Sequence, residues 1–282
     1  MPNNKLQEIF SRRFRALLCG DPSGNPPWLE TVASGEGRGL YLPDDAPWVV
    51  HADLGTLVGG VRALLMQALH PGSLAGTIRW LTITTFASHE ALAAEASRVN
   101  RMHDRVKGQY ETSSGESRSY RAADPDLLRW VHIAFMDSFL RSHQIFSTRP
   151  IPGGADAYVR LWSKSVEPLG LTDVPMNEAE LLTWLDHYRG ELAVNDDTRH
   201  VIQWLRNPPL PRSARPVYAL LFQSALASLP AEHRKLIGLK SLPLSVLRPI
   251  TRTLLKSIRL AIGPENPLED VAKARLNRGG GF

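Results

Sequence analysis

The sequence predicts an all-α protein: one helical domain with helices appended at its N- and C-terminal ends. Residues 124–140 run without a helix breaker, with Asp124 suited to the N-cap and Pro125 to the first helical position. Residues 88–107 have an equally strong helical pattern behind Ser88 as N-cap. No internal repeat and no low-complexity linker divides the chain, so a single domain is the simplest architecture.

Composition narrows the class of protein. The 282 residues are 43% hydrophobic and 22% charged, which are globular values. The net charge of +5 comes without a run of like charges or a nucleic-acid-binding motif, so nucleic acid is a disfavoured partner. Cys19 is the only cysteine, which excludes a disulfide framework or a cysteine-ligated cluster within one chain. Residues 1–18 lack the apolar core of a signal peptide, and we expect a cytoplasmic protein.

We divide the chain into three parts: an N-terminal helix and lead-in loop (1–44), a central helical domain (45–235), and an amphipathic C-terminal helix with a loose tail (236–282). In the first part, residues 4–19 are typical of an amphipathic helix. Residues 20–48 are rich in Gly, Pro and Asp and indicate an extended loop.

The central part opens with a helix over 53–69 that ends at His70-Pro71-Gly72. It carries Arg62 and is too short to cross a bilayer, so we interpret it as a buried helix. Its glycines are typical of close helix packing or of contact with a flat ligand, and packing is favoured. Residues 78–87 are β-branched and ambiguous, with helix favoured by their helical surroundings.

The helix over 88–107 is expected to place Glu90, Glu95 and Asp104 on its solvent side. Residues 108–123 have the composition of a loop or a short hairpin. After the helix over 124–140, further helices are expected at 155–168, at 177–190 with Asn177 as cap and Glu180 three residues on, at 196–206, and from Pro211 to Leu229.

Residues 245–262 are amphipathic, with four basic side chains at helical spacing: Arg248, Arg252, Lys256 and Arg259. The pattern fits a peripheral membrane-surface helix and a domain-covering helix equally well in geometry, and packing is the favoured interpretation. The tail from Arg275 onwards is expected to be loose.

His132 lies at the border of the buried stripe of the helix over 124–140, a stripe predicted to comprise Leu128, Val131, Phe135 and Phe139. The simpler interpretation is a core imidazole with satisfied nitrogens. The alternative is a single axial ligand to haem iron. Arg129, one turn earlier, would then reach a haem propionate, although a surface salt bridge explains it more simply.

Common catalytic signatures are absent from the sequence. There is no Walker loop, no dinucleotide-binding glycine motif, no nucleophile elbow and no metal-binding histidine pair at i, i+4. Paired carboxylates with a histidine at i+3, the di-iron pattern, are absent too. Chemistry performed by this chain is therefore expected to use a cofactor.

Four blocks add a resemblance: Ala63-Leu-Leu-Met-Gln-Ala-Leu-His-Pro71, Arg98-Val-Asn-Arg-Met-His-Asp-Arg-Val-Lys-Gly108, Tyr120-Arg-Ala-Ala-Asp-Pro-Asp-Leu-Leu-Arg-Trp-Val-His132, and Arg206-Asn-Pro-Pro-Leu-Pro211 with Tyr218. In this order they resemble the MpaB-type oxygenase family, the wider group that contains the latex-clearing rubber oxygenases. The similarity covers roughly residues 45–235.

The resemblance implies a globin-like helical bundle that binds haem b and uses O2 to oxidise a small apolar or aromatic organic substrate. His132 matches the proximal iron ligand, and Arg98 matches the arginine that supports the haem from the facing helix. Met102 shares a helix face with Arg98. His103 and His70 match recurrent family positions, and His103 is our candidate for a distal-side or propionate contact.

The chain departs from the rubber oxygenases at two points. Their distal glutamate has no counterpart, since Thr82 to Thr85 hold no carboxylate. A segment that many relatives carry before the next helix is shortened or lost near 76–79, where Ile78 leads directly into Arg79. Two other functions stay open: a haem-binding sensor or carrier without turnover, and a cofactor-free helical binding protein.

Overall fold

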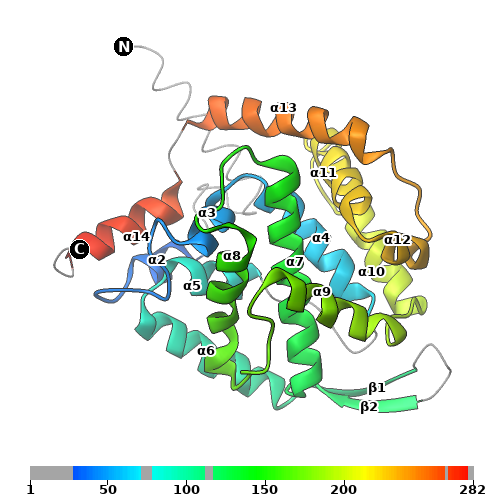
Figure 1. The fold of residues 1–282 in the computed structure, drawn as a ribbon, viewed down its shortest axis with the longest axis horizontal. Coiled ribbons are helices and arrows are strands. Elements are labelled where there is room, and N and C mark those ends of the chain that lie inside the picture. Colours follow the sequence, from blue (N-terminus) through cyan, green and yellow to red (C-terminus); the bar gives the residue numbers. More distant parts are fainter. Residues whose placement is uncertain (1–27, 71–77, 112–116, 264–265, 279–282) are drawn as a thin grey trace.

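The computed structural model describes residues 28–70, 78–111, 117–263 and 266–278, and the protein is a mostly helical single domain (Figure 1). These residues form thirteen α-helices, two short 3₁₀-helices and one two-stranded hairpin. The predicted helical class is confirmed, while the globin-like arrangement and the three-part division stay predictions. The predicted helix over 4–19 and the shortened segment near 76–79 fall wholly or largely outside the described residues.

The centre of the fold is α7 (Pro125–Phe146), which runs through the middle of the molecule (Figure 1). Helix α4 (Thr56–Ala68) packs along it, and α11 (Arg215–Ser228) packs against α4. The helices approach closely at Gly59, where an added Cβ would lie 2.6 Å from Cδ1 of Phe139. The packing interpretation of this glycine is thereby supported.

Helix α4 is buried and carries a buried ion pair. Nη2 of Arg62 donates to Oδ2 of Asp137 on α7 at 2.6 Å, and Nη1 donates to Ser138 Oγ at 2.8 Å. No single helix in the described ranges is long and apolar enough to cross a membrane. Helix α3 (Ala46–Ala52) and α4 are long and apolar enough only when taken together, and they are bent by 97° relative to each other.

The lead-in region is more helical than the sequence predicts. Within the described part of 20–48, α2 (Leu29–Ala33) forms and α3 has already begun at Ala46. The ambiguous stretch is helical, as expected, in α5 (Ile78–Phe86). Its β-branched residues are tolerated because they lie in the core, where burial outweighs their weak helix propensity.

Helix α6 (His89–His103) begins where predicted, since Ser88 Oγ accepts a hydrogen bond from Ala91 N. It ends four residues before the predicted boundary. The chain then turns into a hairpin of β1 (Lys107–Glu111) and β2 (Ser117–Arg121), in antiparallel register with Gly108 opposite Tyr120. A Cβ at Gly108 would lie 2.5 Å from Cε1 of Tyr120, so a glycine there leaves room for the Tyr120 ring to pack across the hairpin.

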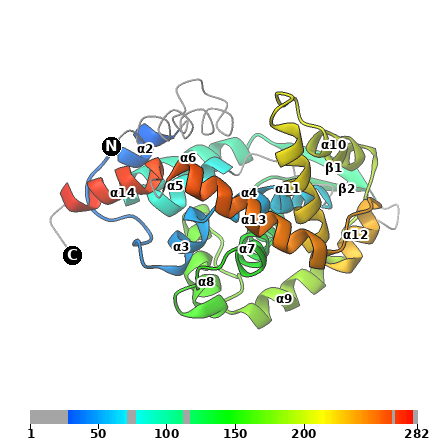
Figure 2. The same ribbon diagram turned by 90° about the horizontal axis from the view of Figure 1, so that it is seen from above.

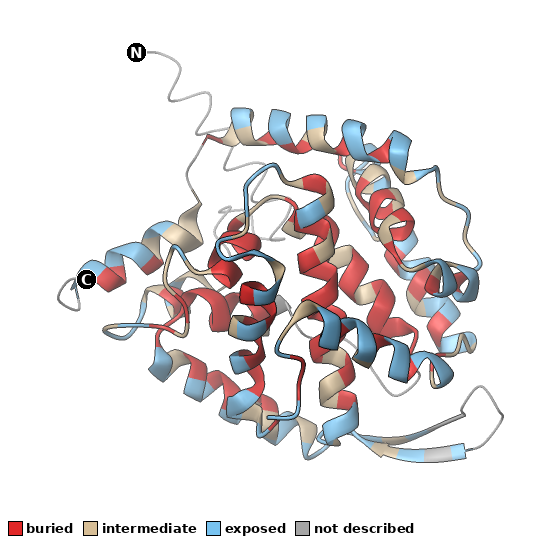
Figure 3. Ribbon diagram, in the orientation of Figure 1, coloured by how far each residue is buried: buried red, intermediate tan, exposed pale blue. Residues whose placement is uncertain are grey.

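Helix α7 extends six residues beyond its predicted end at Leu140. Asp124 precedes it with extended backbone, but its carboxylate accepts from Arg121 N at 2.8 Å and not from the helix. Leu128 and Val131 of the predicted stripe are only half-buried. The helix is buried nearly all round from His132 to Leu140, because neighbouring helices surround it (Figure 3).

The helices that follow agree with prediction closely: α8 (Gly154–Ser163) with the 3₁₀-helix Lys164–Leu169, α9 (Glu178–His187) with the 3₁₀-helix Tyr188–Gly190, α10 (Asp196–Arg206) and α13 (Leu244–Ile262). Asn177 Oδ1 accepts from Glu180 N at 2.9 Å, so the predicted cap of α9 is confirmed. Helix α12 (Ala231–Ile237) was not predicted.

The prediction of a loose tail from Arg275 is wrong as far as residue 278. Helix α14 (Pro267–Arg278) packs against α2 and buries Arg275. The Arg275 guanidinium donates to the backbone carbonyls of Val32 and Phe86, and Nε donates to Gly37 O. A sequence near the chain end cannot reveal this, because the acceptors are backbone atoms more than a hundred residues away.

Candidate functional site

His132 is a fully enclosed histidine on α7. The residue is only 4% exposed. Its ring stacks on the ring of Trp162 of α8, with 6.3 Å between the ring centroids and 16° between the ring planes. Burial lowers its pKa to about 3, so the imidazole is neutral at physiological pH. Nε2 is buried and has no hydrogen-bond partner among the described residues. A buried ring nitrogen left unsatisfied in this way calls for an explanation.

A second buried histidine, His51 on α3, has both nitrogens occupied. Nδ1 lies 2.8 Å from Thr85 Oγ1 and Nε2 lies 3.0 Å from the Tyr158 hydroxyl. The Thr85 hydroxyl already donates to Leu81 O, so it accepts from His51 Nδ1–H, and Tyr158 O–H donates to Nε2. This fixes the tautomer of His51. Burial, with a smaller contribution from nearby His143, lowers the His51 pKa to about 3.

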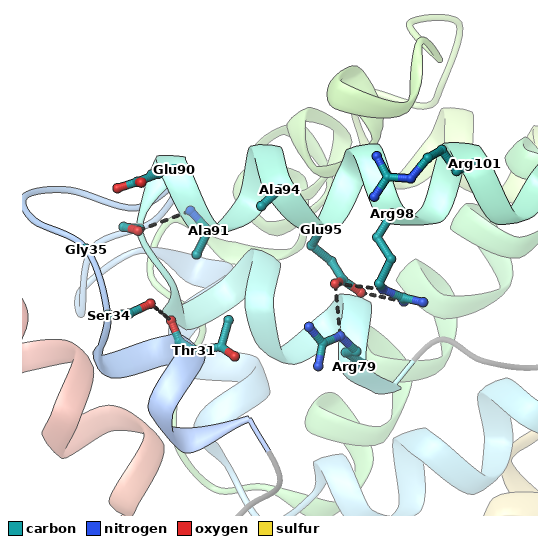
Figure 4. A pocket seen from close by; sticks show the side chains of 11 residues that line it. Thr31, Ser34, Gly35, Arg79, Glu90, Ala91, Ala94, Glu95, Arg98 and Arg101 are labelled. Atoms are coloured by element: carbon teal, nitrogen blue, oxygen red, sulfur yellow. Dashed lines mark hydrogen bonds and ion pairs between the residues drawn. The ribbon is translucent and has the colours of Figure 1, made fainter.

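Arg98 lies at a surface pocket and not in the core. The pocket is a cavity of about 470 Å³ between α2, α5 and α6. Figure 4 shows Arg79 and Arg98 converging on Glu95, while Arg101 points elsewhere. Arg98 donates to Glu95 through Nε at 2.9 Å and Nη2 at 2.6 Å, and Arg79 donates through Nε at 2.9 Å. The Arg98 side chain remains 42% exposed.

The expectation that Glu95 lies on the solvent side is wrong, since this residue is 2% exposed. Burial acts to raise the pKa of its carboxyl, but the hydrogen bonds from Arg98 and Arg79 outweigh burial and hold the pKa below its ordinary value. The same bonds raise the pKa of Arg98. Glu95 is therefore an ionised, buried carboxylate that orients the guanidinium groups of Arg79 and Arg98.

His103 and Met102 end α6 beside this pocket without lining it. Met102 is exposed, whereas His103 is half-buried and its Nδ1 is buried without a partner in the described ranges. Burial lowers the His103 pKa, the nearby positive charge of Arg98 lowers it further, and Asp104 opposes both. The charge of Arg98 therefore reaches the His103 ring. His132 is not among the residues that line the pocket.

Arg129 is engaged by surface partners. Its guanidinium donates to Asp126 at 2.7 Å and to Asp173 at 3.0 Å and lies 4.5 Å above the ring of Trp184. These contacts agree with the simpler interpretation of Arg129 as a salt-bridge residue. The contact with a haem propionate stays a prediction.

His70 is buried just beyond α4, with Nε2 3.5 Å from a carboxylate oxygen of Glu191 and its ring beside Trp130. Burial lowers its pKa, and Glu191 opposes that shift.

Sequence reasoning missed Glu95, Arg79 and the Thr85–His51–Tyr158 chain. For Glu95 a signal exists, because Glu95 and Arg98 are three residues apart on one helix face. For His51 there is none, because its two partners lie 34 and 107 residues away along the chain.

A family model described as "ER-bound oxygenase mpaB/B'/Rubber oxygenase, catalytic domain" matches residues 48–260. The chain belongs to this family. The matched region runs from α3 into α13 and so includes every candidate residue above. Membership of the MpaB/rubber-oxygenase family makes the chain an oxygenase by family, and therefore an oxidoreductase. No curated protein and no solved structure matches the chain.

Proposed function

We propose that this MpaB-family protein is a haem b-dependent oxygenase that acts with O2 on a small apolar or aromatic organic molecule, with His132 as the proximal iron ligand. The observation that carries the proposal is the unpartnered, buried Nε2 of His132. The neutrality of the imidazole and its stacking on Trp162 support the proposal as well. The proposal includes the globin-like arrangement of helices around the cofactor.

The residues present fit such a group. An iron ligand must be a neutral imidazole, and burial keeps His132 neutral by lowering its pKa to about 3. Stacking on Trp162 restrains the ring plane, so the ligand is held in one orientation. When bound there, haem would supply the binding and reductive activation of dioxygen, which no side chain can perform.

The chain's own residues would bind and orient. We assign Arg98 to support of the haem from α6, with Glu95 fixing the guanidinium through two hydrogen bonds. His103, whose pKa is lowered and whose Nδ1 has no partner in the described part of the chain, is assigned a distal-side or propionate contact. Met102 and Arg129 are assigned peripheral contacts to the same cofactor.

The distal side differs from that of a rubber oxygenase. The stretch matched to the distal glutamate is part of α5, where the side chains of Thr82, Thr84 and Thr85 are buried. The Thr85 hydroxyl is already hydrogen-bonded to Leu81 O and to His51 Nδ1. Without a carboxylate base there, we propose a small substrate and not polymer cleavage.

The test compares two histidines of α7. His132→Ala is expected to abolish haem binding, because it removes the ligand nitrogen. His143→Ala is the matched control: His143 is also buried and also has one buried nitrogen, Nδ1, without a partner among the described residues, but its Nε2 is bonded to Arg149 O at 2.7 Å. Haem content per folded protein is measured by visible absorption, with far-ultraviolet circular dichroism to verify folding. Equal haem retention in the two variants would contradict the assignment.

Turnover is measured separately as substrate-dependent O2 consumption by the haem-loaded protein. Consumption with small aromatic or apolar compounds supports an oxygenase, and haem binding without any consumption would identify a sensor or carrier.

A further inference from the structure

Helix α13 has one face on the protein and one face in solvent. It lies across the outside of the molecule over α11 and the end of α7 (Figure 2). Its inner residues Leu247, Thr251, Leu255 and Ile258 are buried, and Thr251 is hydrogen-bonded to Ser224 of α11 at 2.6 Å. Figure 3 shows exposed residues recurring along the opposite side. The helix is therefore firmly packed and leaves a continuous outer face.

The outer face of α13 carries exposed apolar side chains, whereas the solvent-facing side of a helix is ordinarily polar. Val246 is 45% exposed, Ile250 48% and Leu260 70%. At about 100° per residue these three side chains fall within a sector of roughly 80°. The residues between them in the same sector, Thr253 and Ser257, are exposed and uncharged. An exposed apolar stripe of this kind indicates an interaction site.

Two more exposed apolar side chains come shortly before α13 in the chain. These are Leu236, on α12, and Leu242. Together with the three residues on α13 they account for half of the large hydrophobic side chains that are exposed in the described part of the chain. Exposed apolar surface is thus concentrated on one segment, residues 236–260, and not scattered singly over the protein.

The charged side chains of this segment all have one sign. Residues 236–262 contain five Lys or Arg and no Asp or Glu. Arg252 is committed to the fold, since it donates to Ile145 O at 2.9 Å and to Ser147 O at 3.2 Å at the end of α7. Lys240, Arg248 and Lys256 are exposed. At about 100° per residue, Lys256 lies roughly 40° beyond the edge of the apolar sector, whereas Arg248 lies on the other side of the helix. An apolar sector with a basic side chain at its edge, on a segment without acidic residues, matches an anionic bilayer surface in both respects.

We propose that α13 docks this protein onto an anionic lipid surface, with Val246, Ile250 and Leu260 entering the headgroup–acyl boundary. Lys256, at the edge of the sector, and Lys240, just before the helix, would contact lipid phosphates. A second copy of the chain is a poorer occupant, because it would bring two basic surfaces together. The inference does not rest on the proposed haem chemistry.

The test uses the full chain and sedimentation with vesicles. Wild-type protein is expected to sediment with vesicles of equal parts phosphatidylcholine and phosphatidylserine, and to remain in solution with phosphatidylcholine alone. The double variant Val246→Glu/Ile250→Glu is expected to lose this binding, because its carboxylates would enter the interface. Lys256→Gln is expected to weaken it about fivefold.

Leu182→Glu is the matched control, since Leu182 is 49% exposed on α9, away from the α13 stripe, and its substitution should leave vesicle binding unchanged. Three outcomes would overturn the proposal. The first is a wild-type protein that does not bind the anionic vesicles, and the second is a double variant that binds as well as wild type. The third is a dimer in sedimentation velocity that the double variant abolishes, which would make the stripe an interface between copies.

Discussion

His51 and His132 are alike in burial and in pKa but differ in their hydrogen bonds and in how their rings meet Trp162. Both are buried, both have a pKa lowered to about 3, and both contact the ring of Trp162. His51 makes a T-shaped contact at 4.5 Å and exchanges hydrogen bonds with Thr85 and Tyr158. His132 stacks and leaves Nε2 unpartnered.

The difference separates a structural histidine from a candidate ligand. Neutrality and burial are common to both and identify neither. An imidazole whose two nitrogens are occupied stabilises the native state through its partners. An imidazole with one enclosed, unpartnered nitrogen carries a desolvation cost in the protein alone, and an electrophile bound to that nitrogen would offset this cost.

The largest effect expected from this comparison is on the stability of the haem-free protein. His51→Ala should lower the free energy of unfolding by about 3 kcal/mol, since it leaves a cavity and an unsatisfied Tyr158 hydroxyl. His132→Ala should cost less, because no hydrogen bond at Nε2 is lost. Urea denaturation of both variants measures the difference. Equal losses would show that the two histidines do not differ in the way described.

A smaller effect concerns pH. The pKa of His51 is about 3 in the folded chain and about 6.5 when unfolded, so between these values only the unfolded chain binds the proton. Stability due to this lowered pKa is present above pH 6.5 and is lost as pH falls toward 3, at about 1.4 kcal/mol per pH unit. The penalty of His51→Ala should therefore shrink in acid. Urea denaturation at pH 7 and pH 5 tests this, and a constant penalty would contradict it.

Local signals in the sequence predicted most helices. The Ser88 and Asn177 caps are local, since each side chain bonds a backbone N–H three residues on. Helix α10 is bounded by its own amphipathic pattern and was predicted at its observed residues. His132 was singled out from its place on α7 and from the family blocks. These signals need no knowledge of the tertiary structure.

What the sequence could not predict depends on distant contacts. Glu95 has the helical position of a surface carboxylate, and only Arg79 of α5 together with Arg98 makes its burial tolerable. Arg275 is near the chain end, yet it binds carbonyls of Val32 and Phe86. The hydrogen bonds that distinguish His51 from His132 are likewise long-range.

The central claim, that His132 holds haem, is tested most directly by the visible spectrum of the purified protein, recorded oxidised, reduced and with carbon monoxide. A Soret band that shifts on reduction and again with carbon monoxide is the predicted result, because a single histidine ligand leaves the sixth position accessible. A colourless protein that also fails to take up added haem would contradict the assignment of His132 and the oxygenase chemistry built on it.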